Sequence, residues 1–293
     1  MDKLYNFINY FHKDDTINRS TLGVDRVRGG SAFLRWRGSD LIALILLFVL
    51  YPIVYRIEPF QRQFYVDDLT ISHPFAEHER VTAGELFFYA SVVPVAAIGV
   101  ISIIITKPQH KVYVTYVSIL GLLLSVFSAS VITDILKNAF GRHRPDFLAR
   151  CVPKPDTPKG VLVFAKDVCT TKDVGRLLDG FRTTPSGHSS ISFAGLLFLS
   201  LWIAGQLAVT RPYSGAWRWA VAAVPTVGAS LIALSRTEDY RHHFIDITVG
   251  SILGILIAVW SYLRLFPLIN HEKSYEPRVI IDEEADSHQY SPV

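Results

Sequence analysis

A polar stretch in the last quarter of the chain contains residue types that suit phosphate chemistry. His242 and Asp246 are four residues apart, and Arg236 precedes the histidine by six. If the chain is helical from Arg241 onward, the imidazole and the carboxylate lie on one helix face, where the carboxylate can hold the histidine in one tautomer. Such a histidine is a candidate nucleophile, and the planar fork of the arginine suits phosphate oxygens. On this spacing alone, a satisfied polar pair beside a lipid headgroup explains the residues equally well.

Two further groups of residues precede this stretch. Lys137 and Arg144 are seven residues apart, and a proline follows the arginine. A later Pro-Ser-Gly-His sequence ends at His188, directly before an apolar run. The two cations and the downstream arginine supply three positive charges that can stabilise a transferring phosphoryl group. The backbone N–H groups of Ser186 and Gly187, at the start of a predicted helix, are additional anion donors.

The same residues favour a reaction without a metal ion or another cofactor. Three fixed positive charges can perform the charge stabilisation that a metal ion supplies in other phosphatases. The two candidate histidines lack the accompanying set of carboxylates that is typical of magnesium or zinc phosphatases. The sequence also shows no phosphate-binding P-loop and no dinucleotide-binding fingerprint.

Taken in order, the three groups read Lys-x6-Arg-Pro, Pro-Ser-Gly-His and Ser-Arg-x5-His-x3-Asp. This set resembles the three signatures of the type 2 phosphatidic acid phosphatase family, the lipid phosphate phosphatases, at every specified position. The resemblance implies that His242, oriented by Asp246, attacks phosphorus to form a phosphohistidine. It implies that His188 protonates the leaving group and then activates water. It implies phosphate-binding roles for Lys137, Arg144, Ser186, Gly187 and Arg236.

The resemblance covers residues 40–268. At 64–74, 169–188 and 231–246 the sequence is similar in detail to the fungal diacylglycerol pyrophosphate phosphatases of this family. That branch implies magnesium-independent removal of the β-phosphate from diacylglycerol pyrophosphate and then dephosphorylation of phosphatidate to diacylglycerol. It also implies a vacuolar membrane. A sphingoid-base or isoprenoid phosphate phosphatase would share every catalytic residue. A catalytically silent membrane scaffold or an ion-conducting bundle is the alternative from a different class.

The apolar residues predict an all-α integral membrane protein with six transmembrane helices. Hydrophobic residues make up 50% of the 293-residue chain, and most lie in runs with hardly any charge. About 20 apolar residues are needed to cross the hydrocarbon core as a helix. The runs are 41–55, 86–106, 112–133, 191–209, 219–234 and 247–263. A membrane and a phospholipid substrate are the expected partners. A net charge of +3 does not suggest nucleic acid, and the oligomeric state is left open.

Charge near the first run predicts how the chain is oriented. Arginines from Arg19 to Arg37 favour a cytosolic segment at residues 1–39, followed by a membrane domain at 40–268. An acidic tail at 269–293 is expected to be cytosolic and mostly disordered. With six spans, all three signatures then lie on the luminal or exterior side. Total counts of lysine and arginine on the two sides are nearly equal, so this orientation depends on the amino-terminal cluster.

Two long connections lie on the side of the signatures. Residues 134–189 contain Cys151 and Cys169, which the orientation places in an oxidising compartment and which are predicted to form a disulfide. Residues 56–85 are expected to be an ordinary connection, with a cover over the pocket as the alternative.

Several basic residues stand beside the signatures without belonging to them. Arg142, His143, Arg182 and Arg241 are each expected to be solvated charges, with the hypothesis that some bind a second phosphate of a pyrophosphate headgroup. His243 adjoins the candidate nucleophile but is out of phase with Asp246 on a helix, so a structural or supporting role is expected.

Overall fold

The apolar runs form six helical stretches that are long and apolar enough to cross a membrane. The computed structural model describes residues 21–22, 24–26 and 28–289. The stretches are Gly38–Tyr55, Ala83–Ile105, Lys111–Phe140, Gly187–Gln206, Ala216–Glu238 and Phe244–Leu265. No strand occurs in the described part of the chain. The prediction of an all-α protein with six spans is confirmed, and each predicted run overlaps one stretch.

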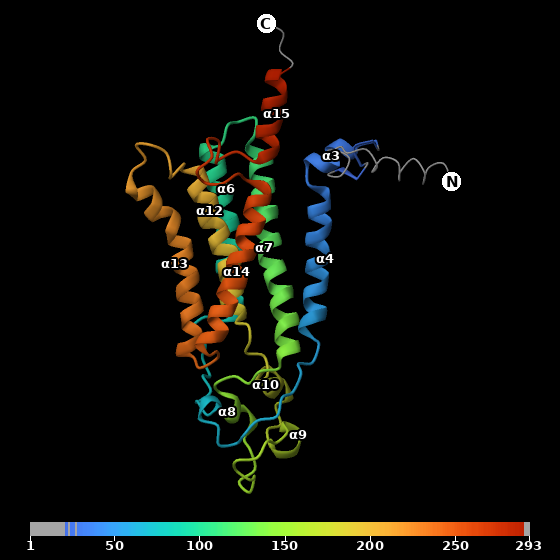
Figure 1. Cartoon of the computed structure of the whole chain (residues 1–293), viewed down its shortest axis with the longest axis vertical. Helices are drawn as coiled ribbons and strands as arrows, with labels where there is room; N and C mark the ends of the chain where they lie inside the picture. Colours follow the sequence, from blue (N-terminus) through green and yellow to red (C-terminus); the bar gives the residue numbers. More distant parts are fainter. Residues whose placement is uncertain (1–20, 23, 27, 290–293) are drawn as a thin grey trace, which may run out of the picture.

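Four of the spans are single α-helices and two are interrupted by a π-helical segment. The single helices are α4 (Gly38–Tyr55), α7 (Lys111–Phe140), α13 (Ala216–Glu238) and α14 (Phe244–Leu265). The second span consists of α5 (Ala83–Phe87), η3 (Phe88–Val92) and α6 (Val93–Ile105). The fourth consists of α11 (Gly187–Ser192), η4 (Phe193–Leu197) and α12 (Phe198–Gln206). The third and fourth spans are the most buried, whereas α4 stands at the edge of the bundle and is mostly exposed (Figure 1).

Helix α7 is longer than its apolar run predicts, and the extension forms part of the candidate site. Polar residues end the apolar run at 133, but the helix continues to Phe140 and includes Lys137. It ends at Gly141, whose φ of 56° lies in the left-handed region that favours glycine. A Cβ atom there would also lie 1.9 Å from the carbonyl oxygen of Phe60. The helix end thus depends on this glycine.

Short helices cap both ends of the bundle. Helices α3 (Gly30–Arg35) and α15 (Arg278–Gln289) lie at one end, while α8 (Phe147–Cys151), α9 (Ala165–Val168) and α10 (Val174–Asp179) lie at the other (Figure 1). With an even number of spans, the two terminal segments must lie on the same side of the membrane. Arg19 and the rest of residues 1–20 lie outside the described residues.

The acidic tail is more ordered than its composition predicts. Residues 278–289 form α15, and Ile280 is buried in the core between the spans. Glu283 of α15 forms an ion pair with Arg35 of α3. A few apolar residues within an acidic segment are sufficient to dock it when the bundle offers an apolar surface. The expectation of a mostly disordered tail is therefore wrong for 278–289, and 290–293 lie outside the described residues.

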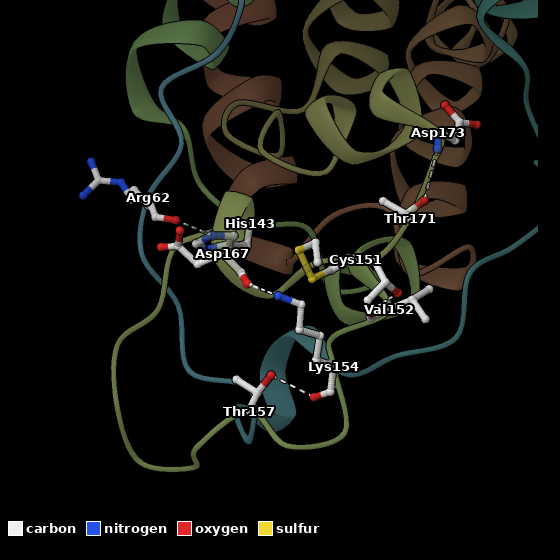
Figure 2. Close-up of a disulfide and its surroundings, with 11 residues drawn as sticks. Arg62, His143, Cys151, Val152, Lys154, Thr157, Asp167, Thr171 and Asp173 are labelled. Atoms are coloured by element: carbon white, nitrogen blue, oxygen red, sulfur yellow. Dashed lines mark hydrogen bonds between the residues drawn. A yellow bond between two sulfur atoms is a disulfide. The ribbon is translucent and has the colours of Figure 1, made fainter.

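The connections after α4 and α7 fold together over the end of the bundle around a small shared core. Its buried residues are Phe64, Ile71, Phe147, Cys151, Ala165, Val168 and Phe181. The predicted disulfide between Cys151 and Cys169 is present and crosses this core (Figure 2). Beside it, Lys154 Nζ donates to the carbonyl oxygen of Asp167 over 2.7 Å. The covalent link fixes the connection that carries the first two signatures.

Candidate active site

The three signatures meet at the end of the bundle that α8, α9 and α10 cover. Lys137 lies in the last turn of α7, His188 in the first turn of α11 and Arg236 in the last turn of α13. Arg144 and His242 lie in the loops that follow α7 and precede α14. All five residues line one cavity of about 270 Å³. The helix ends bring together residues that are far apart in the sequence, as the signatures predict.

Three cations of the cavity differ in how they are neutralised. Lys137 Nζ donates to the carbonyl oxygen of Arg182 over 2.9 Å. Arg144 Nη2 lies 2.9 Å from Asp179 Oδ1. Arg236 is 2% exposed, and its Nε has no hydrogen-bond partner among the described residues. Its Nη1 lies 3.0 Å from Glu79 Oε2, so a carboxylate neutralises this buried guanidinium.

Asp179 of α10 holds two arginines of the site region. Its Oδ2 lies 2.9 Å from Arg150 Nη1, so that each carboxylate oxygen has one arginine partner. Burial alone would raise the pKa of Asp179, but the charges of Arg144 and Arg150 outweigh it and hold this pKa well below its ordinary value. The carboxylate therefore stays ionised and fixes Arg144 at the cavity wall.

The candidate nucleophile reaches its carboxylate through a threonine. His242 Nδ1 lies 3.2 Å from Thr183 Oγ1, and this hydroxyl donates to Asp246 Oδ2 over 2.7 Å. The prediction that His242 and Asp246 share a helix face is wrong, because α14 begins only at Phe244. The histidine precedes the helix, so helical spacing does not apply to it. Thr183 bridges the gap that results.

This relay selects the nitrogen that faces the phosphate-binding residues. The Thr183 hydroxyl donates to Asp246, so its oxygen accepts from Nδ1–H of His242, and Nε2 keeps its lone pair. Arg144 Nη1 lies 3.4 Å from Nε2. Burial, together with the charges of Arg144 and Lys137, holds the pKa of His242 well below its ordinary value. The imidazole is therefore neutral near neutral pH, which is the nucleophilic form.

Asp246 is a completely buried acceptor shared by several groups. His243 Nδ1 lies 3.1 Å from Asp246 Oδ2, and the backbone N–H of His243 donates to the same oxygen over 2.8 Å. These contacts cap the first turn of α14. Arg142 Nη1 lies 3.0 Å from Oδ1 of the carboxylate. The histidine that was expected to be out of phase with Asp246 thus contacts it directly, in the supporting position expected for it.

In the Pro-Ser-Gly-His signature, Ser186 has a structural role and Gly187 lines the cavity. The side chain of Ser186 caps α11, and its backbone N–H donates to the carbonyl oxygen of Asp246 over 2.9 Å. This N–H joins the second signature to the third and has its acceptor there. Gly187 lines the cavity, and a Cβ atom on it would lie 3.5 Å from Lys137 Cε. Of the two predicted backbone donors, Gly187 is the one at the cavity.

Comparison with known proteins decides the family. Residues 118–269 match the model of the PAP2 superfamily. The chain belongs to this superfamily. It is 50% identical over 263 residues to diacylglycerol pyrophosphate phosphatase 1 of Saccharomyces cerevisiae. The aligned residues are 88% of this chain and 91% of that protein. The predicted family and the predicted enzyme class, a phosphatase, are confirmed.

Other PAP2 relatives are more distant but similar over most of their length. The probable diacylglycerol pyrophosphate phosphatase 1 of Schizosaccharomyces pombe is 42% identical, over 80% of this chain and 82% of that protein. Lipid phosphate phosphatase 2 of Arabidopsis thaliana is 35% identical, over 91% of this chain and 90% of that protein. No solved structure matches the chain.

The basic residues beside the PAP2 signatures are not solvated charges, except that the Arg142 side chain stays partly exposed. Arg182 lines the cavity, and its Nη2 donates to the carbonyl oxygens of Tyr55 and Ile57. Arg142 is occupied by Asp246, outside the cavity. Arg182 is therefore the member of this group that remains a candidate for contacting a second phosphate.

His143 and Arg241 are buried for different reasons. The ring of His143 packs edge-on against Phe147, with ring centroids 4.5 Å apart, and its Nε2 lies 3.1 Å from the carbonyl oxygen of Arg62. Burial lowers the pKa of His143 to about 4, so the ring is an uncharged part of the extramembrane core. Arg241 Nη2 lies 3.1 Å from Glu79 Oε1. The expectation of solvated side chains is wrong at both positions.

The connection between the first two spans covers the PAP2 cavity. The carbonyl oxygen of Val81 lies 2.9 Å from His188 Nε2 and also accepts from Arg236 Nη1 over 3.1 Å. Glu79 lines the cavity and pairs with Arg236. The expectation of an ordinary connection is wrong, and the alternative, a cover, is correct. Sequence reasoning missed these residues and Thr183, because no local pattern distinguishes them.

Proposed function

We propose that this chain is a metal-independent lipid phosphate phosphatase that removes the terminal phosphate of diacylglycerol pyrophosphate and then the phosphate of phosphatidate. The observation that carries the proposal is the convergence of Lys137, Arg144 and Arg236 on the cavity to which Nε2 of His242 is adjacent. The names of the two yeast relatives supply the choice of substrate.

The lining of the cavity supports a lipid rather than a soluble phosphate ester. Besides the charged residues, it includes Tyr51 of α4 and Leu86 and Phe87 of α5. The rings of Tyr51 and Phe87 are 5.9 Å apart, so the two spans meet beside the phosphate-binding residues. An anion pocket with an apolar wall at the end of membrane helices fits a headgroup whose acyl chains stay in the bilayer.

In the proposed mechanism, the cations bind the phosphate oxygens while His242 Nε2 attacks phosphorus in line with the leaving oxygen. A P–N bond forms, and the P–O bond to the leaving group breaks. His188, whose Nε2–H donates to the Val81 carbonyl oxygen, acts as the imidazolium and gives its second proton, on Nδ1, to the leaving oxygen. Water then attacks phosphorus and gives a proton back to His188, the P–N bond breaks, and inorganic phosphate and neutral His242 result.

The test is phosphate release by purified protein in detergent micelles with excess chelator. Diacylglycerol pyrophosphate, phosphatidate and a sphingoid-base phosphate are compared side by side, with His242→Ala as the inactive control. We expect chelator-resistant release with a preference for the diphosphate. Loss of activity with chelator would refute a metal-independent reaction. A preference for the sphingoid substrate would favour that alternative, and no release from these lipids or an isoprenoid diphosphate would favour a scaffold.

We further propose that the active site faces the lumen of the vacuole or another endomembrane compartment, with residues 1–39 and 269–293 in the cytosol. The Cys151–Cys169 disulfide supports this orientation, because disulfides persist in oxidising compartments. Helices α3 and α15 at the opposite end of the bundle agree with it (Figure 1).

A glycosylation acceptor inserted in the exposed turn at residues 156–160 tests the orientation. We expect a glycosidase-sensitive mobility shift there, and none for the same insertion at residues 212–214, in the loop between the fourth and fifth spans. The reverse pattern would place the site in the cytosol. Co-fractionation with vacuolar membranes tests the organelle.

A further inference from the structure

A carboxylate from the covering connection lies among the cations of the cavity. Glu79 Oε2 is 3.0 Å from Arg236 Nη1, and Glu79 Oε1 is 3.1 Å from Arg241 Nη2. Glu79 lines the cavity together with Lys137 and Arg144. Both of its oxygens are thus bound to guanidinium groups in the manner of phosphate oxygens.

The backbone on the carboxyl-terminal side of Glu79 keeps this carboxylate in place. The N–H of Arg80 donates to Asp239 Oδ2 over 3.0 Å, and its side chain forms an ion pair with Glu238 over 2.7 Å. The next residue, Val81, accepts from Arg236 Nη1. These contacts fix the covering connection to the end of α13, so the backbone next to Glu79 stays beside the cavity.

A phosphate bound at Arg236 must interact unfavourably with Glu79. A phosphate oxygen that binds this guanidinium beside Nη1 brings the dianion close to the carboxylate, and the two negative charges repel each other. If it binds at Nη1, it must first displace Glu79. In a cavity partly withdrawn from water, such repulsion is screened less than at the surface.

Building on the phosphatase function proposed above, we propose that Glu79 sets the affinity of this cavity for phosphate: its charge weakens binding of the phosphate dianion and so limits retention of the inorganic phosphate product. The three arginine and lysine groups alone would bind a dianion more tightly. A carboxylate at this place offsets part of their charge.

The other carboxylates near the cavity do not play this part. Asp239 is also 3.5 Å from Arg236 Nη1, but it does not line the cavity. Asp179 lines it, but each of its oxygens pairs with another arginine, Arg144 or Arg150. Asp134 lines it without forming an ion pair to any of the three signature cations in the described part of the chain. Glu79 is the carboxylate of the cavity lining that pairs with Arg236.

The experiment compares three full-length variants with the wild type in detergent micelles. Glu79→Gln removes the charge and keeps the shape, and Glu79→Asp keeps the charge with a shorter reach. Glu77→Gln is the matched control, because Glu77 lies on the same connection, points to Arg176 and is not part of the cavity lining. The readouts are KM and kcat for phosphatidate, the inhibition constant of inorganic phosphate, and the rise in melting temperature that phosphate causes.

We expect Glu79→Gln to lower the inhibition constant of phosphate and KM about fivefold or more, while Glu79→Asp and Glu77→Gln stay within about twofold of the wild type. An unchanged or higher inhibition constant for Glu79→Gln would overturn the proposal, and a lower kcat with a higher KM would instead indicate that Glu79 positions Arg236. An equal change in Glu79→Asp would also overturn it, because the charge would not be the cause.

Two further measurements separate the possible failures. If Glu79→Gln does not fold, Glu79→Ala removes the same charge, and its inhibition constant decides the question by the same criterion. If the wild type hydrolyses no lipid, the proposed function fails, but the melting-temperature shift with inorganic phosphate still compares the affinities. A larger shift for Glu79→Gln than for the wild type would then support the role of Glu79, and an equal or smaller shift would refute it.

Discussion

Replacement of His242 by alanine is expected to lower kcat/KM for phosphatidate by about 10⁴-fold or more, because the proposed reaction proceeds through a bond to its Nε2. The cations and the backbone of Gly187 would still bind the substrate, so KM should change far less than kcat. The measurement is phosphate release in micelles, combined with acid-labile phosphate trapped on the protein after rapid denaturation. Wild-type protein should carry this label, and the variant should not.

His243→Ala is the matched control for this loss. His243 is adjacent in sequence and contacts the same carboxylate, but it does not line the cavity. We expect its activity to fall much less than that of the His242 variant, with both proteins retaining the melting behaviour of the wild type. Full activity in His242→Ala would contradict a phosphohistidine mechanism. Equal losses in the two variants would show that the third signature acts only through the cap of α14.

Thr183→Val is expected to lower kcat by about 100-fold with little change in KM, because it removes the hydroxyl that links His242 to Asp246. Without that link, Nδ1–H of the histidine has no acceptor there, and the ring is free to turn or to change tautomer. The loss should appear in kcat, since Thr183 does not line the cavity and is not among the phosphate-binding cations.

Two neighbouring substitutions determine whether the effect is specific. Thr183→Ser restores a hydroxyl at the same position and should recover most of the activity. Thr184→Val removes a hydroxyl that also donates to Asp246, at Oδ1, but has no contact with His242. We expect the Thr184 variant to lose less than the Thr183 variant. If the two valine variants were equally impaired, the threonine would support the carboxylate only, and the relay to the histidine would be wrong.

The expected and the observed arrangements of His242 and Asp246 illustrate what residue spacing can and cannot predict. The positions of His242 and Asp246 in the third signature are local properties of the sequence. The contact between them depends on where α14 begins, and a helix start is decided by capping partners that include residues from elsewhere. Thr183 is 59 residues from His242 in the chain, so no local pattern predicts that its hydroxyl lies between His242 and Asp246.

The local sequence also does not predict burial where a side chain packs against a distant segment. His143 reads as a basic residue beside a signature, but three phenylalanines from separate parts of the chain surround it. Ile280 belongs to an acidic tail by composition, but it finds an apolar surface between the spans. In each case much of the free energy of burial comes from distant partners, which for His143 are Phe64 and Phe181.

By itself, the sequence determined the six spans, the disulfide partners and the identity of the signature residues. The reason is that membrane insertion depends on continuous apolar length, and that the chemistry of phosphate binding requires particular side chains. Only the tertiary structure decided that Thr183 links His242 to Asp246 and that Glu79 and Val81 cover the cavity. These contacts join segments from different ends of the chain, and packing of the helices alone brings such segments within hydrogen-bond distance.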